Sequence, residues 1–330
     1  MKVFNKILNA VAISLLAYFA VALGMIYSQS PVTLIGEGGL DFSAQISAPS
    51  EVSAKLQPYT TRDGGELFAR HYEAKVENAP LVILLHGSGW HGLQFDGLAR
   101  ELSSIAQVIV PDLRGHGAQP ERRGDIDYIG QFEDDIADLI QQQARPDQQV
   151  ILAGHSSGGG LVVRFAGGDQ GHLVDKAVLL APFLKYNAPT TRENSGGWAR
   201  VLTRRIIGLS MLNRFNIYRW NQMHVIQFKF PNSVLSGALG HTATTSYSYR
   251  LNTSFAPRSD YLKDVAALPE FLLIAGVRDE AFVAEQYEPV MSAVTNNGQY
   301  TLVKGVSHLE IVDAPETLDA MTTFIAPDTR

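Results

Sequence analysis

The chain of 330 residues contains no cysteine. Disulfide bonds, thiolate zinc sites and a cysteine nucleophile are therefore excluded, although the redox compartment stays open. An excess of positive charge is also missing, because 27 Lys and Arg stand against 33 Asp and Glu. The net charge of −6 gives no overall basic field, so nucleic acid is not expected as a partner.

Charge of either sign is absent from one long stretch near the N-terminus, between Lys6 and Glu37. Its residues 7–27 are mostly apolar, and as a helix they would span about 30 Å, the thickness of a bilayer's hydrocarbon core. Lys2 and Lys6 come before this stretch, so the positive-inside rule places the N-terminal tip in the cytoplasm and the remainder across the membrane.

The first 28 residues therefore predict a transmembrane anchor that is not cleaved. The alternative is a cleaved signal peptide, with Ala22-Leu23-Gly24 as a tolerable cleavage site and a secreted product. Both interpretations export the rest of the chain. Residues 29–50 are rich in Ser, Gly and Pro and are interpreted as a linker.

Residues 51–330 alternate between short apolar runs and helical patterns. Two alternating stretches, 52–61 and 66–73, flank Asp63-Gly64-Gly65 and predict a β-hairpin. Continuous apolar runs predict strands buried on both faces at Leu81–Leu85, Val108–Val110, Val150–Ala153, Ala177–Leu180, Phe271–Ala275 and Tyr300–Val303. Helices are expected at about 94–104, 128–144, 157–166, 281–296 and 314–325. This alternation predicts a doubly wound, mostly parallel α/β sheet.

One interval, at about 184–268, breaks the alternation because it contains no convincing parallel strand. It holds 11 Lys and Arg against 3 Asp and Glu, a net charge of +8 that leaves −14 for the remainder. It also contains many aromatic residues, so we interpret it as an inserted lid. Within it, residues 198–220 predict a basic amphipathic helix whose apolar face comprises Trp198, Val201, Leu202, Ile206, Leu209 and Leu212.

The stretch ILAGHSSGGG, residues 151–160, joins a predicted strand to a small-residue helix start. G-x-S-x-G in this setting indicates a nucleophile elbow with Ser156 as the exposed serine, since the flanking glycines remove side chains that would clash. The alternatives are an ordinary Gly/Ser loop and a phosphate loop, but the Lys-Ser/Thr ending of the P-loop is missing.

A nucleophilic serine needs an acid and a base, which in this arrangement follow it in the chain. Asp279 stands directly after the predicted strand FLLIA, and His308 is the only histidine beyond it. We predict both as members of a triad with Ser156. Asp279 could also serve as a helix N-cap, Glu280 is the competing carboxylate, and His308 alone could be a surface residue.

The second half of an oxyanion site is expected in the loop His86-Gly87-Ser88-Gly89, which follows the strand LVILL. We predict the backbone N–H groups of Ser88 and Ser157 as its two donors. His86 precedes the nucleophile and is interpreted as a structural hydrogen-bonding residue. His155, inside the elbow, is expected to be structural and to point away from the site.

Five motifs in this order, HGSGWHG, PDLRGHG, GHSSGG, GVRD and SHLE, resemble those of the α/β-hydrolase superfamily. Within it, residues 55–327 resemble the monoacylglycerol lipase and lysophospholipase group. The resemblance implies the α/β-hydrolase fold, with Ser156, His308 and Asp279 as the triad and the Ser88 and Ser157 N–H groups as the oxyanion hole. One departure is the serine after the nucleophile, where many lipases of this group have methionine or glutamine.

These residues predict hydrolysis of carboxylic esters, lipid-like or otherwise apolar, through an acyl-enzyme and without a metal or cofactor. Amide, peptide, thioester or lactone hydrolysis by the same triad stays open, as does a membrane-tethered binding module without catalysis. The anchor and the basic lid together suggest a position close to lipid. Packing of the lid helix on its own domain, with its arginines in solvent, is the alternative.

Overall fold

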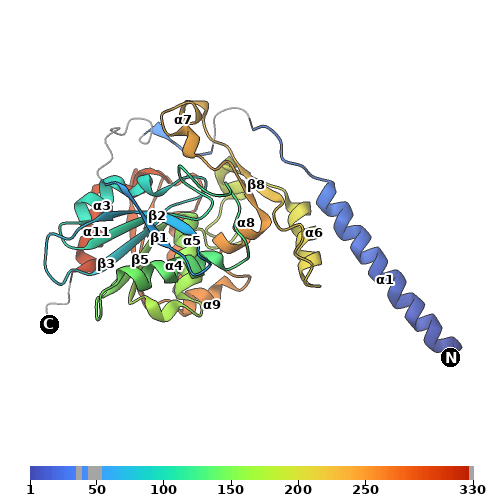
Figure 1. The fold of residues 1–330 in the computed structure, drawn as a ribbon. Coiled ribbons are helices and arrows are strands. Elements are labelled where there is room, and N and C mark those ends of the chain that lie inside the picture. The colour runs from blue at the N-terminus through green and yellow to red at the C-terminus, as the bar shows by residue number, and fades with distance from the viewer. Residues whose placement is uncertain (35–38, 44–53, 327–330) are drawn as a thin grey trace.

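The computed structural model describes residues 1–34, 39–43 and 54–326. A twisted β-sheet forms its centre (Figure 1). The sheet has eight strands in the order β1-β2-β4-β3-β5-β6-β10-β11. The strands are β1 (Leu56–Thr60), β2 (Glu66–Tyr72), β3 (Leu81–Leu85), β4 (Gln107–Asp112), β5 (Val150–His155), β6 (Lys176–Leu180), β10 (Glu270–Gly276) and β11 (Gly298–Val303). Only the β1–β2 and β2–β4 pairs are antiparallel. The predicted hairpin and the mostly parallel sheet are confirmed; residues 52 and 53 of the hairpin lie outside the described residues.

The central strands β3 and β5 are buried along their whole length, as expected for apolar runs covered on both faces. Helices α3 and α11 contact each other on one side of the sheet, and α4 and α5 lie on the other (Figure 1). Their bounds are α3 (Asp96–Leu102), α4 (Gln131–Gln143), α5 (Ser157–Ala166) and α11 (Pro315–Ile325). Each confirms a predicted helix to within three residues at either end. Because the central strands run parallel, their carboxyl ends lie at one edge of the sheet.

The helix predicted at 281–296 is wrong in its extent. The α-helix there, α10, runs only over Tyr287–Met291, after a short 3-10 turn at Ala284–Gln286. Asp279 accepts the backbone N–H groups of Ala281 and Phe282, and Phe282 forms a β-bridge with Thr191. Because these bonds hold residues 281–283 outside helical geometry, the helix begins later than periodicity suggests.

The segment between β6 and β10 contains a small antiparallel sheet of order β7-β8-β9, which the sequence analysis did not predict. The strands and α-helices of this segment are β7 (Ala199–Val201), α6 (Thr203–Asn213), β8 (His224–Phe228), α7 (Asn232–Leu235), β9 (Ser246–Ser248), α8 (Tyr249–Phe255) and α9 (Tyr261–Ala266). The amphipathic helix predicted at 198–220 is therefore confirmed only for α6. Residues 199–201 are extended because they pair with β8.

Helix α1 (Lys2–Tyr27) extends away from the sheet (Figure 1). Among the described residues it is the one helix long and apolar enough to cross a membrane, by length and composition. Its C-terminal part packs against α6, where Ala22 and Ile26 are fully buried. Apart from that contact its surface is mostly exposed.

Candidate active site

Ser156 lies in the sharp turn between β5 and α5. Its φ of 56° and ψ of −120° place a non-glycine residue in a strained conformation of the kind found at functional sites. The flanking glycines make the turn possible, since a Cβ on Gly154 would lie 2.4 Å from the Gly158 carbonyl oxygen. A Cβ on Gly158 would lie 2.1 Å from the Leu85 carbonyl oxygen. The G-x-S-x-G spacing is therefore a steric requirement of this elbow.

Asp279 and His308 come together at the carboxyl ends of β10 and β11. The Nδ1 atom of His308 donates to Oδ2 of Asp279 at 2.8 Å, and both side chains are buried. The other carboxylate oxygen accepts the N–H groups of Ala281 and Phe282 at 2.8 and 2.7 Å. Asp279 is thus fixed by its own loop, and it holds His308 in the tautomer that leaves Nε2 free to accept a proton.

Glu280, the competing carboxylate, does not contact the imidazole. Its Oε2 atom accepts the backbone N–H of His308 at 2.9 Å, and its Oε1 atom accepts the backbone N–H of Asp41 at 3.2 Å. Glu280 therefore positions the loop that carries His308, while Asp279 contacts the ring.

Ser156 and His308 line the same two small cavities, of about 20 and 70 Å³. Among the described residues, the Ser156 hydroxyl makes no hydrogen bond. Contacts between a nucleophile and its base are often long in an unliganded site and shorten when substrate binds. The structure thus places the hydroxyl and the imidazole around one space without joining them directly.

The two predicted oxyanion serines lie side by side, because their hydroxyl groups share a hydrogen bond. In the same loop, the Gly87 N–H donates to Oε1 of Gln94 at 3.0 Å, and the Gly89 N–H donates to the Tyr247 hydroxyl. Among the described residues, no hydrogen bond takes up the N–H of Ser88 or of Ser157. These two donors are available to a developing oxyanion.

His155 links the base to the oxyanion loop. Its Nε2–H donates to the carbonyl oxygen of His308 at 2.8 Å, and its Nδ1 accepts from the Gln94 amide at 2.6 Å. The rings of His155 and His308 are only 4.6 Å apart, so the prediction that His155 points away from the site is wrong. Burial lowers the pKa of His155 well below its usual value and keeps it neutral.

Tyr247 of β9 is a further buried residue at the site that the sequence analysis missed. While its hydroxyl accepts the Gly89 N–H, it donates to Nε2 of His116 at 2.7 Å. The Nδ1–H of His116 donates to the Arg114 carbonyl at 3.0 Å, which leaves Nε2 as the acceptor. A tyrosine from the small antiparallel sheet thus holds the oxyanion loop. No local motif marks it, because its partners are about 130 to 160 residues away.

The predicted structural role of His86 agrees with its contacts. Its Nδ1–H donates to the Gly87 carbonyl at 2.9 Å, and its Nε2 accepts the Leu113 N–H at 3.1 Å. Burial lowers the pKa of His86 to about 4 and that of His116 to about 3. Both rings are neutral in the folded protein and each fills a position that cannot readily take a charge.

The lowered pKa values of His86 and His116 predict that acid destabilises the folded protein. The unfolded chain protonates histidine near pH 6.5, so their stabilisation is complete above that pH and is lost as the pH falls toward 4. Between pH 7 and 5 each should lower the free energy of unfolding by about 2 kcal/mol. Urea unfolding at the two pH values checks this. His116→Gln should remove the part of the pH dependence that His116 contributes, whereas His172→Gln, at an exposed position, should not. Equal pH dependence of the wild type and both variants would contradict this prediction.

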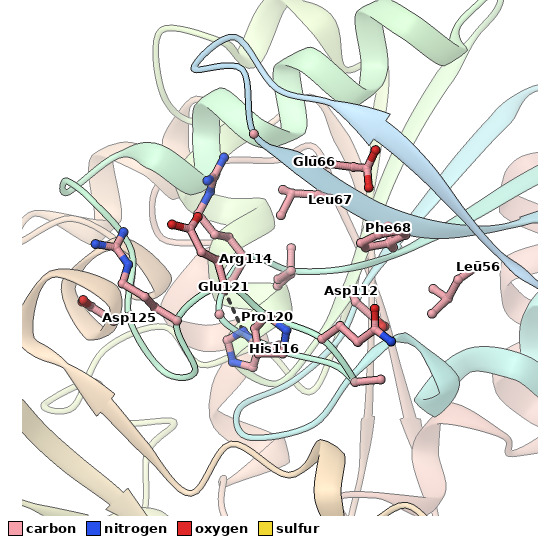
Figure 2. A pocket seen from close by; sticks show the side chains of 16 residues that line it. Leu56, Glu66, Leu67, Phe68, Asp112, Arg114, His116, Pro120, Glu121 and Asp125 are labelled. Carbon is pink, nitrogen blue, oxygen red and sulfur yellow. Dashed lines mark hydrogen bonds between the residues drawn. The ribbon is translucent and has the colours of Figure 1, made fainter.

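A cavity larger than the two at Ser156, of about 270 Å³, is lined by none of the triad residues. It is bounded by β2, with Glu66 and Leu67, and by the loop that carries Pro120 and Glu121 (Figure 2). Several charged groups around it are already paired, namely Asp112 with Arg70, Arg114 with Asp135, Arg122 with Asp127 and Asp125 with Arg250. Size alone therefore does not make it the reactive site.

The cavities at Ser156 are walled by aromatic side chains from three parts of the chain. Phe42 contacts Trp90, Trp198 and Phe230, with ring centroids 5.5 to 6.1 Å apart. Within the described residues, no Asp, Glu, Lys or Arg lines either cavity. This environment suits an apolar, uncharged group beside the reactive serine.

Residues 77–313 match the family model described as serine aminopeptidase, S33. Among curated relatives, monoglyceride lipase from Homo sapiens is 28% identical over 157 residues, which are 46% of this chain and 49% of that protein. The monoglyceride lipase from Rattus norvegicus is 26% identical over the same extent. The chain spans about half the length, or less, of the curated relatives that it matches.

Solved structures cover more of the chain. A soluble variant of monoglyceride lipase from Saccharomyces cerevisiae aligns with a TM-score of 0.64 at 15% identity, covering 84% of this chain and 97% of that one. A putative aryl esterase from Burkholderia cenocepacia aligns with a TM-score of 0.60 at 18% identity, covering 82% and 98%. The α/β-hydrolase fold is thereby confirmed, and the resemblance to the monoacylglycerol lipase group is confirmed as a distant one.

Proposed function

Since the chain belongs to the serine aminopeptidase S33 family of α/β-hydrolases, we propose that it hydrolyses carboxylic esters of lipid-like or other apolar substrates through an acyl-enzyme. Ser156 is the nucleophile, His308 the base and Asp279 the orienting acid. The observation that supports this best is the buried Asp279–His308 pair, whose histidine lines the same cavities as the elbow serine.

In the proposed reaction, Ser156 Oγ attacks the ester carbonyl while His308 Nε2 takes its proton. Asp279 keeps Nδ1–H in place and stabilises the imidazolium that forms. The N–H groups of Ser88 and Ser157 stabilise the tetrahedral oxyanion, each by about 3 kcal/mol of barrier. His308 then protonates the departing alcohol, and a water molecule activated by the same imidazole hydrolyses the acyl-enzyme.

The cavity walls favour an ester with an apolar acyl group over an aminopeptidase substrate. A free peptide N-terminus carries an ammonium group, and a buried ammonium needs a carboxylate partner. Among the described residues, neither cavity has one. Amide or peptide hydrolysis is the second candidate, because the matching family model is described as a serine aminopeptidase. Thioesters and lactones would be attacked by the same triad.

A fluorophosphonate probe tests the catalytic proposal directly. We expect covalent labelling at Ser156, located by peptide mass, and hydrolysis of p-nitrophenyl esters well above that of aminoacyl p-nitroanilides. Monoacylglycerol and lysophospholipid extend the panel to lipid-like esters. Absence of labelling would contradict catalysis and support a binding module, and faster cleavage of the anilides would favour the peptidase.

Tyr247→Phe removes only the hydroxyl that fixes Gly89 and contacts His116. Because the oxyanion loop then loses one support, we expect kcat for ester hydrolysis to fall about ten-fold with little change in KM. Tyr249→Phe is the matched control, since its hydroxyl bonds to Ser210 within the lid region. Equal kinetics for the two variants would show that Tyr247 does not support the loop.

We further propose that α1 anchors the protein in a membrane, with the hydrolase domain on the non-cytoplasmic side. The apolar length of α1 and the two lysines at its start support this orientation. A secreted protein, released by cleavage of the N-terminal segment, is the alternative. In either case, the basic lid is a second candidate region for contact with lipid.

A further inference from the structure

A short segment between α1 and the hydrolase domain, residues 39–43, enters the reactive site and is called the strap here. Leu40 and Phe42 of the strap line the cavity of about 20 Å³ that Ser156 also lines. Phe42 is only 6% exposed. The strap precedes residues 77–313, which match the family model. It is therefore a part of the site that comes from outside the region shared with the family.

The strap is held between the lid and the loop that carries the base. Gly39 has a φ of 100°, and a Cβ there would lie 2.6 Å from the backbone nitrogen and Cα of Trp198. The Asp41 N–H donates to Oε1 of Glu280 at 3.2 Å, and Oε2 of the same carboxylate accepts the His308 N–H at 2.9 Å. One carboxylate thus fixes both the strap and the base loop.

The chain before the strap is tied to the lid as well. The Val32 N–H donates to Oε1 of Gln227 at 2.9 Å, and the Gln227 amide donates to the Val32 carbonyl at 2.6 Å. Gln227 belongs to β8 of the lid. Because Val32 is fixed in this way, the strap stays near its site within the same molecule, at a high effective concentration.

Phe42 leaves little room beside the nucleophile. Its ring lies among those of Trp90, Trp198 and Phe230, and the space that remains next to Ser156 is about 20 Å³. A cavity of this size holds about one water molecule. A methyl group therefore fits beside the serine while Phe42 is in place, and a longer apolar chain does not.

The strap bounds only one of the two cavities at Ser156. Neither Leu40 nor Phe42 lines the second cavity, of about 70 Å³, which lies on the lid side with Phe228 and Phe255 in its wall. In the proposed reaction the alcohol leaves first, while the acyl group stays bonded to Ser156. The cavity that the buried Phe42 shields from solvent suits the group that stays, and the second cavity is then available to the alcohol.

We propose that Phe42 determines which acyl-chain lengths the site accepts, because its ring fills the acyl cavity and a long chain binds only by displacing the strap. This rests on the ester hydrolysis proposed above. Displacement exposes the phenylalanine ring to water, and this free-energy cost lowers kcat/KM for long acyl chains. Phe42 is thus a specificity-determining residue supplied by the segment that follows α1.

Phe42→Ala tests this on the full-length chain, with p-nitrophenyl acetate, butanoate and octanoate as substrates. In the wild type, kcat/KM should fall as the acyl chain lengthens. In Phe42→Ala, the ratio of kcat/KM for octanoate to that for acetate should rise about ten-fold or more, mainly through a lower KM for octanoate. An unchanged ratio would overturn the proposal.

Val32→Ala is the matched control from the same segment. The Val32 side chain is 47% exposed, and its contacts with Gln227 are made by its backbone, which alanine keeps. The octanoate-to-acetate ratio should therefore stay at the wild-type value. Phe42→Leu keeps an apolar side chain and should raise the ratio by a smaller factor than alanine, so the test still stands if Phe42→Ala does not fold.

Gly39→Ala tests the strap without changing any side chain in the cavity. The added Cβ would collide with the Trp198 backbone, so the strap must shift and the octanoate-to-acetate ratio should rise. Gly64→Ala is the matched control, because Gly64 also has a positive φ, of 80°, but no atom lies within 4 Å of its added Cβ. Equal ratios in these two variants would contradict the role of the strap in holding Phe42.

A second substrate series separates the two cavities. Acetate esters of methyl, butyl and octyl alcohols lengthen the alcohol and keep the acyl group small. Phe42→Ala should leave their relative kcat/KM values unchanged, because Phe42 does not line the second cavity. A shift as large as that in the acyl series would overturn the assignment of the strap cavity to the acyl group.

Fluorophosphonate labelling of each variant distinguishes this inference from the proposed function. Variants that label at Ser156 and hydrolyse esters with the wild-type chain-length ratio would overturn the role of Phe42 and leave the hydrolase proposal in place. A folded wild-type chain that neither labels nor hydrolyses any ester would contradict the proposed function itself.

Discussion

Ser156→Ala should reduce kcat for ester hydrolysis about 10⁶-fold, because the acyl-enzyme can no longer form. Fluorophosphonate labelling should disappear as well. The residual rate comes from substrate binding and from the oxyanion donors, which the substitution leaves in place. Hydrolysis of a p-nitrophenyl ester, with the folded state checked by circular dichroism, measures the effect.

Ser157→Ala is the matched control for this prediction. Ser157 is expected to act through its backbone N–H, which alanine keeps, and its hydroxyl bonds, within the described part of the chain, only to that of Ser88. We expect less than a ten-fold loss and full labelling. A comparable loss in both variants, or retained labelling in Ser156→Ala, would show that the nucleophile is misassigned.

Asp279→Asn should lower kcat about 10⁴-fold while the protein stays folded. An asparagine amide can donate to Nδ1 of His308, and this would place the imidazole proton on Nε2. That nitrogen could then no longer accept the proton of Ser156. KM should change little, because Asp279 is buried behind the imidazole and does not line the cavities.

Glu280→Gln tests whether the neighbouring carboxylate has the same role. Of the residues that the structure describes, Glu280 accepts hydrogen bonds only from the backbone N–H groups of His308 and Asp41, and glutamine keeps one acceptor oxygen for His308. We expect less than a ten-fold loss of kcat. A larger loss in Glu280→Gln than in Asp279→Asn would assign the orienting acid to position 280 and contradict the geometry described above.

The elements that carry the site could be predicted because each has a local signature. The elbow follows from G-x-S-x-G after a buried strand, and Asp279 and His308 follow from polar residues at the ends of apolar strands. Parallel strands bring their carboxyl ends to one edge, so three distant positions meet once the strand order is known. The predicted ends of these strands were also close to the observed ones, because the apolar runs that mark the strands are local features of the sequence.

The lid and the supports of the site could not be predicted in this way. Residues 199–201 pair with a strand more than twenty residues away, so helical periodicity at 198–220 gave too long a helix. Gln94 binds the side chain of His155 and Tyr247 binds the backbone of Gly89, 61 and 158 residues away, and sequence spacing does not encode such contacts. Tertiary pairing decided these features, and local preference was overridden.

The bridge from Gln94 through His155 to the His308 carbonyl has a consequence for how this protein could be redesigned. It ties the reacting groups to one another through buried hydrogen bonds. Phe42, Trp198 and Phe230 instead contact one another through their rings and line the cavity beside the serine. Selectivity for new acyl groups can therefore be sought by exchanging those rings, with the chemical step left intact. Substitutions in the bridge should instead lower the activity without changing the preference for one acyl group over another.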